Sequence, residues 1–101
     1  MPEERMAMVR SAIDNIMNDV LQQAYQHSMN YPQDSDQLNV LIRAVSEDNE
    51  SLINRLHQVK VLNDKPLIDL ELNSITKTLK KKSLEHLSAL QKLKEKNSPK
   101  T

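Results

Sequence analysis

Glycine is missing from this chain of 101 residues, and proline occurs only four times. Strands joined by tight hairpins usually need glycine, because the favoured turns place residues at positive φ. Phosphate-binding loops and calcium-binding EF-hand loops also require glycine at fixed positions, so the sequence excludes both. Helices joined by short polar turns have no such requirement. The chain is therefore predicted to be all-α.

Cysteine is also absent, which excludes disulfide bonds, iron–sulfur ligation and any zinc site built on thiolates. No apolar run approaches the roughly 18 residues that a membrane-spanning helix needs. The first residues, Met1 to Glu4, lack the basic and apolar regions of a secretory signal. We therefore expect a cytoplasmic (intracellular) protein without a transmembrane segment.

Aromatic residues are limited to Tyr25 and Tyr31, so leucine, isoleucine, valine and methionine must supply nearly all of the apolar burial. Aliphatic side chains repeated every three or four positions are typical of helices packed on helices. A chain of this length has room for one small domain. We expect a single helical domain over residues 1–96, folded as an antiparallel helical hairpin or an elongated three-helix bundle with coiled-coil-like packing.

The first predicted helix covers residues 3–29. Glu3 and Glu4 suit its start, where the helix dipole favours negative charge. Its apolar line has the alternating spacing of three and four and consists of Met6, Val9, Ile13, Ile16 and Val20, with Met17, Ala24 and His27 on or beside it. Pro32 follows the helix and disfavours helical geometry at the residue before it.

The second predicted helix covers residues 35–62, and Asp34 and Gln37 have the spacing of a capping box at its start. Its apolar face is formed by Leu38, Leu41, Ile42, Val45, Leu52, Leu56 and Val59. Residues 46–51 are all polar, and Asn49 falls on the apolar face. Either one long helix carries a buried Asn49 that fixes the register, or the helix breaks here. The apolar phase agrees on both sides, which favours the continuous helix.

The third predicted helix covers residues 65–96, with Asp64 as a cap and Pro66 in the first turn. Its heptad line is Ile68, Leu72, Ile75, Leu79, Lys82, His86, Ala89 and Leu93. The line is apolar as far as Leu79 and fails at the next two positions.

Beyond this failure the leucines of the third helix lie progressively to one side of the line. They are Leu84, Leu87 and Leu90. This displacement predicts that the helix changes neighbours after residue 80. The remaining residues, 97–101, are predicted to form a disordered tail.

The charges are balanced in total but separated along the chain. Residues 1–71 carry twelve acidic and six basic side chains, whereas residues 72–101 carry two acidic and eight basic ones. The sharpest cluster is Lys77, Lys80, Lys81 and Lys82, which is a possible anion-binding surface for nucleic acid or, less favoured, anionic lipid. However, this segment has no aromatic residue to stack on a base and no arginine to contact guanine. A solvated basic face, or one that meets acidic segments of this chain or a copy, is favoured.

Catalysis and metal binding need a cluster of suitable side chains, and the sequence pattern contains none. His27, His57 and His86 are far apart, and none has a second histidine or a carboxylate at metal-ligand spacing. We expect no catalytic residues, no cofactor and no metal, and therefore no enzyme activity.

Three helices of about 40 Å each, from a rise of about 1.5 Å per residue, make a rod that does not easily cover all its apolar faces. This favours self-association or a protein partner. We expect a noncatalytic interaction module, such as a small helical subunit, adaptor or chaperone-like regulator of a larger assembly. The predicted partner-binding residues are Met6, Val9, Ile13, Leu84, Leu87, Leu90 and Leu93. The alternative is a regulatory protein that binds nucleic acid through the lysines of the third helix.

Overall fold

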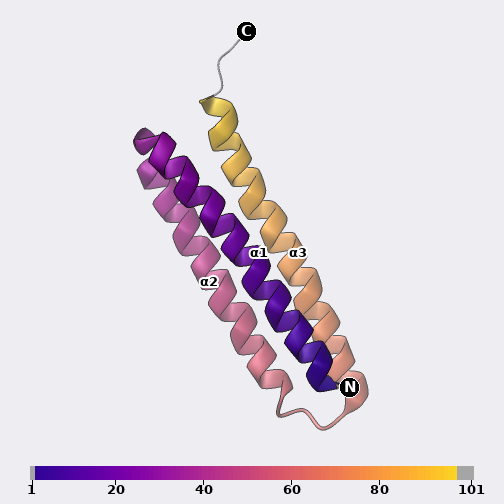
Figure 1. Cartoon of the computed structure of the whole chain (residues 1–101). Coiled ribbons are helices and arrows are strands. Elements are labelled where there is room, and N and C mark those ends of the chain that lie inside the picture. Colours follow the sequence, from indigo (N-terminus) through magenta and orange to yellow (C-terminus); the bar gives the residue numbers. More distant parts are fainter. Residues whose placement is uncertain (1, 98–101) are drawn as a thin grey trace.

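The computed structural model describes residues 2–97 and contains three long helices and one short one. Helix α1 spans Pro2–Asn30, the 3₁₀ helix η1 spans Pro32–Asp34, α2 spans Ser35–Val59 and α3 spans Lys65–Lys96. The long helices run alternately in opposite directions along one bundle (Figure 1). The molecule measures 56 × 22 × 17 Å. The prediction of an elongated, all-α bundle is confirmed.

The helix limits follow the sequence pattern closely except at the end of α2. This helix stops at Val59, and residues 60–62 form a turn in which Lys60 and Leu62 donate their N–H groups to His57 and Val59. The polar residues 46–51 lie within α2 without a break. The continuous second helix is therefore confirmed, although it ends three residues earlier than predicted.

The two predicted cap residues occupy the N-cap positions of α2 and α3, but their side chains do not cap these helices. Asp34 precedes α2, and Asp64 precedes α3, but neither carboxylate makes a hydrogen bond to the helix that follows. At α3 the backbone carbonyl of Asp64 accepts the N–H of Ile68 at 3.0 Å, and Pro66 lies in the first turn, where its missing N–H costs no hydrogen bond. The side chain of Asp34 has other partners, described below.

The core is a single aliphatic column along the bundle. Its fully buried members from α1 and α2 are Ile13, Met17, Val20, Ala24, Leu38, Leu41, Val45, Leu52, Leu56 and Val59. The predicted apolar faces of both helices therefore point inward, while Met6, Val9 and Ile16 pack only partly against the column.

Helix α3 contributes to the same column along most of its length. Its buried apolar side chains are Ile68, Leu72, Ile75, Leu79 and Leu90. His86, which is only 8% exposed, fills the position between Leu79 and Leu90. The predicted change of neighbours after residue 80 is therefore wrong, because a polar side chain occupies a core position and the inward face continues beyond it.

Each long helix thus covers much of the apolar surface of the other two. What remains exposed is scattered: Met8, Tyr25, Met29, Val40, Val61, Leu67, Leu70 and Leu84. None of the helices in residues 2–97 combines the length and the apolar character needed to cross a lipid bilayer.

Candidate interaction surfaces

The residues predicted to bind a partner do not form one surface. Ile13 and Leu90 are 0% and 1% exposed, because both belong to the core of the bundle. The partly buried members of the set are Met6, Val9, Leu87 and Leu93. Leu84 alone of the seven is largely exposed, at 68%. The prediction is therefore corrected for Ile13 and Leu90, which hold the chain's own helices together.

The lysines predicted to bind anions lie on the outer side of α3. Lys77, Lys80 and Lys81 are exposed and form no ion pair with any residue between 2 and 97. Lys82 is half-buried and pairs with Glu85 at 3.8 Å. Three positive charges within little more than one helical turn therefore have no counter-charge among the described residues.

Leucines share this outer side of α3 with the lysines. Leu70, Lys77 and Leu84 follow one another at intervals of seven, so they lie along one side of the helix. Leu70 and Leu84 are each 68% exposed. We call the surface formed by Lys77, Lys80, Lys81 and Leu84 the lysine face. It combines positive charge with an exposed apolar side chain.

The outer side of α2 carries the opposite charge. Asp36, Glu47 and Glu50 are exposed, and none of them forms an ion pair within residues 2–97. Val40 lies between these carboxylates and is 70% exposed. The outer sides of α2 and α3 therefore differ in the sign of most of their charges.

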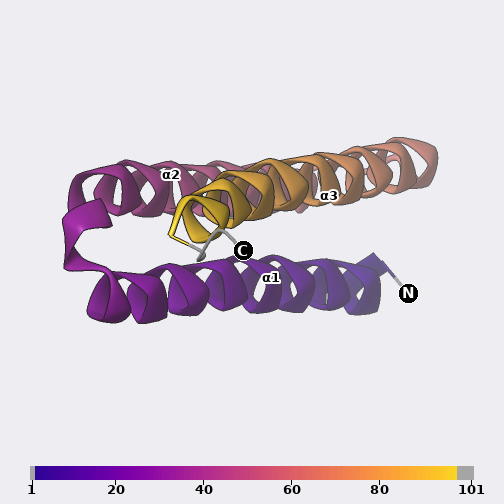
Figure 2. The same cartoon turned by 90° about the horizontal axis from the view of Figure 1, so that it is seen from above.

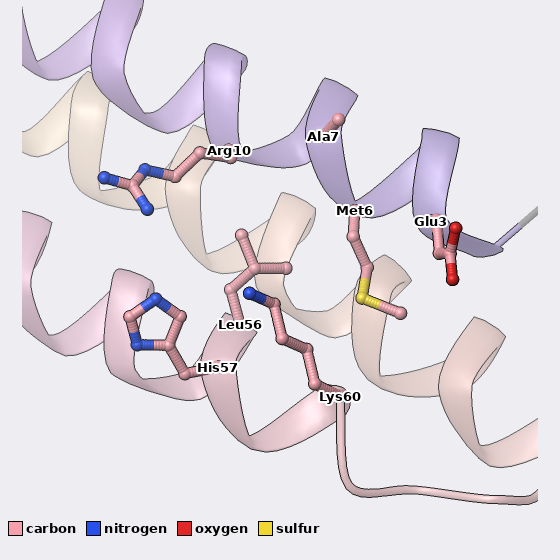
Figure 3. A pocket seen from close by; sticks show the side chains of 7 residues that line it. All are labelled: Glu3, Met6, Ala7, Arg10, Leu56, His57 and Lys60. Carbon is pink, nitrogen blue, oxygen red and sulfur yellow. The ribbon is translucent and has the colours of Figure 1, made fainter.

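A groove opens between the beginning of α1 and the end of α2 (Figure 3). It has a volume of about 520 Å³ and is lined by Glu3, Met6, Ala7, Arg10, Leu56, His57 and Lys60. Arg10, His57 and Lys60 reach toward the same space from the two helices, and Arg10 also pairs with Asp14 at 3.2 Å. His57 makes no side-chain hydrogen bond within residues 2–97. The groove therefore lacks an oriented acid–base pair.

Polar contacts fix how α2 and α3 are aligned. Nη2 of Arg55 donates to Oε1 of Glu71 at 2.7 Å and to Oγ of Ser74 at 2.9 Å. Further along, Nε2 of His86 lies 2.6 Å from Oδ2 of Asp48. The two helices are antiparallel, so these two contacts set their register at separate points.

The contact between His86 and Asp48 explains two breaks in the sequence pattern. The polar stretch 46–51 of α2 and the failure of the apolar line at His86 lie opposite each other in the bundle. Asn49, predicted to be the buried register residue, is half-buried and makes no side-chain hydrogen bond within residues 2–97. Asp48 takes that role instead. The matching of two polar breaks was the only signal in the sequence.

Replacing Asp48 with leucine is expected to destabilise the protein by about 1–3 kcal/mol, because the nearly buried His86 then loses its partner. Replacing both residues with leucine is expected to recover this loss, since an apolar pair of similar size fills the same space. Urea denaturation of the two single variants and the double variant measures the coupling between them. A double variant as unstable as the sum of the singles would contradict the assignment.

The most buried polar cluster surrounds Asp34, whose side chain is completely inaccessible to solvent. His27 donates from Nε2 at 2.8 Å, Lys96 from Nζ at 2.9 Å and Asn97 from Nδ2 at 2.6 Å. The ring of Tyr31 stacks on His27 with centroids 4.7 Å apart. The Asp34 cluster, comprising these five residues, therefore ties the end of α3 to the corner between α1 and α2.

These donors lower the pKa of the Asp34 carboxyl to about 2, from its ordinary value of 3.8. The hydrogen bond from His27 has the largest effect, followed by that from Lys96, while burial acts in the opposite direction. A histidine held by an aspartate is a familiar catalytic pair, but the side chain of His27 is only 3% exposed. The Asp34 cluster nevertheless borders a surface pocket of about 320 Å³, which His27 and Tyr31 help to line.

The Asp34 cluster also corrects the predicted tail. Asn97 was expected to begin a disordered segment, yet it follows α3 directly and its side chain binds Asp34. The rest of the predicted tail, residues 98–101, lies outside the described residues. Within residues 2–97 there is no group of three or more histidine, aspartate or glutamate side chains arranged to hold a metal ion.

Comparison with protein-family models, with curated proteins and with solved structures gives no match for this chain. Its function is therefore inferred from its own residues and contacts.

Proposed function

We propose that this chain is a noncatalytic protein-interaction module, a small helical subunit, adaptor or chaperone-like regulator, whose lysine face binds an acidic helical surface of another protein chain. The observation that supports this most directly is Leu84. It is 68% exposed and stands beside lysines that have no counter-charge within residues 2–97. Both features make the face suited to a partner that supplies apolar contact and negative charge together.

The energetics favour such a partner. Complete burial of a leucine side chain contributes about 1.5–3 kcal/mol, which is more than an exposed ion pair supplies at about 0–1 kcal/mol. Leu84 would therefore provide affinity, while Lys77 and Lys81 would orient an acidic helix. Helix-on-helix recognition of this kind uses anchors at spacings of three, four and seven, which is the spacing of the exposed residues on α3.

Nucleic acid is the weaker alternative, although the unpaired lysines would contact phosphates. The lysine face carries no arginine and no aromatic side chain. Leu84 and Leu70 would remain exposed or would be placed against a highly hydrated phosphate backbone. A protein partner uses all the residues of the face, whereas a nucleic acid uses only its charges.

The two functions are separated by replacing Leu84 with serine. With a labelled peptide designed as an amphipathic helix of leucine and glutamate, we expect binding to weaken about tenfold or more, the equivalent of about 1.4 kcal/mol or more. Met29, which is 81% exposed on α1, supplies the control variant Met29→Ser, whose binding should be unchanged. Fluorescence anisotropy measures both.

A short DNA duplex provides the contrasting probe. If the chain acts on nucleic acid, the duplex will bind, its affinity will fall steeply with salt, and Leu84→Ser will have no effect. That result, or peptide binding that is equal in the wild type and Leu84→Ser, contradicts the proposed function.

A further inference from the structure

We infer that the acidic partner is a second copy of this chain, joined through the outer sides of α2 and α3 about a two-fold axis parallel to the bundle. This inference rests on the proposed function and identifies its partner. We call this surface the α2–α3 outer face. Figure 2 shows α1 below α2 and α3, so the side of these two helices turned away from α1 is not covered by a third helix.

The residues of this face follow from the internal contacts. On α2, His57 and Lys60 border the groove shared with α1, and Glu47 lies on the other side of the helix. On α3, Asp69 faces α1 through its ion pair with Arg5. Helical spacing then places Lys77, Lys81, Glu85 and Lys92 on the side of α3 away from α1.

The register between the helices is fixed within each chain. Arg55 is level with Ser74, the middle of its three partners on α3, and the contact between Asp48 and His86 is displaced from this register by about five residues, or about 7.5 Å. Because the helices are antiparallel, counting outward from Arg55 and Ser74 gives the residues of α3 that are level with any residue of α2.

A two-fold axis parallel to the bundle preserves this register between copies. Such an axis leaves the height of every residue along the bundle unchanged. It places α2 of one copy against α3 of the other, again antiparallel. The symmetry therefore fixes the register between the two copies. At this register, facing charges are either opposite and attract or alike and repel.

Three pairs of opposite charges lie at similar levels along the face. Counting from Arg55 and Ser74, Asp36 is level with Lys92 and Glu47 is level with Lys81 to within one residue. Arg43, the exposed cation on this part of α2, is level with Glu85. At these three levels the α2 and α3 residues carry charges of opposite sign.

Apolar residues match at the end of the face near the turn between α2 and α3. Val61 is 77% exposed and Leu67 is 49% exposed, and the same register makes them level. A second copy therefore supplies apolar contact at Val61 and Leu67, and opposite charge at the three levels named above. An isologous interface repeats each of these contacts twice, because the same patch serves both copies.

The matching could also act inside one chain, since Glu47 and Lys81 of the same copy are level too. However, Lys81 forms no ion pair within residues 2–97. Exchanging charges between two chains distinguishes the two cases. Glu47→Lys alone, or Lys81→Glu alone, sets like charges against each other at both contacts of the dimer. An equal mixture of the two variants restores both attractive contacts, but only between different chains.

Sedimentation velocity is the test. We expect the wild type to dimerise, each single variant to dissociate at least about tenfold more readily, and the equal mixture to recover the dimer. Lys60→Glu, which makes the same charge change beside the groove, should leave the dimer intact. Circular dichroism establishes that each variant is folded. The dimer should also weaken as salt increases, because exposed charges are screened.

Two outcomes would overturn the inference. The first is a wild type that stays monomeric at concentrations of about 100 μM. This would mean that the free energy of dimerisation is smaller in magnitude than about 5.5 kcal/mol. The second is recovery in the double variant Glu47→Lys/Lys81→Glu without recovery in the mixture, which would show that the charges act within one chain. In either case, the proposed function would still be supported if the acidic peptide binds and this binding depends on Leu84.

Discussion

Replacing Met17 with alanine is expected to lower the free energy of unfolding by about 2–5 kcal/mol. Met17 is 1% exposed and lies in the middle of α1, where its side chain contributes to the aliphatic column. Truncation leaves a cavity that long, straight helices cannot close by collapse. Small domains are stable by only about 5–15 kcal/mol, so this one substitution removes a large part of the total. Urea denaturation followed by circular dichroism measures it.

Met8 supplies the matched control for this prediction. It lies nine positions earlier on the same helix and is 72% exposed. Met8→Ala makes the same chemical change and is expected to alter stability by no more than about 0.5 kcal/mol. Equal effects at the two positions would mean that α1 does not present the face described here to the rest of the bundle.

The difference between these methionines was readable from the sequence. Met17 falls on the apolar line of the first helix, whereas Met8 falls away from it. The lack of glycine and the spacing of three and four also predicted the class of fold. Turn formation and the inward face of a helix depend on residues within one or two helical turns, so both can be predicted from residues that are close in sequence.

Long-range polar contacts were not readable in this way. Asp34 has the sequence context of a helix cap, yet its partners Lys96 and Asn97 come from the other end of the chain. A capping pattern describes only the four residues around it. It carries no information about a donor that arrives more than sixty positions later, and the local interpretation was therefore wrong.

Only part of the candidate surface was predicted, because a local sequence pattern does not show which helices meet. In the sequence the lysines of α3 stand out as a cluster, and Leu84 stands out as a leucine beside the inward-facing line. The structure places Lys77, Lys80, Lys81 and Leu84 outside. Ile13 and Leu90 were misassigned, because the sequence shows that a side chain is apolar but not which helix covers it. Which helix covers a given apolar side chain depends on how the three helices pack around the aliphatic column.

Acid is expected to release the end of α3 through Asp34. The pKa of this carboxyl is about 2 in the folded chain and about 3.8 as the ordinary value. Between these values the folded chain keeps Asp34 ionised, while the unfolded chain protonates it. Unfolding therefore takes up as much as about one extra proton, and stability falls with falling pH across this window. The contribution is complete above about pH 5, where the carboxyl is almost fully ionised in both states.

Asp34→Asn isolates this effect, because an amide does not titrate in the same range. Urea denaturation between pH 4 and pH 2 should show a weaker pH dependence for Asp34→Asn than for the wild type, a window set by the lowered and ordinary pKa values. Asp36→Asn, which changes an exposed carboxylate two positions away, should keep the wild-type dependence. Asp34→Asn should also accelerate hydrogen exchange at neutral pH relative to the wild type. The acceleration should be larger over residues 87–96, which the Asp34 cluster anchors, than over residues 65–79. A wild type whose stability depends on pH no more than that of Asp34→Asn would show that the carboxylate is not held in its charged form by His27 and Lys96.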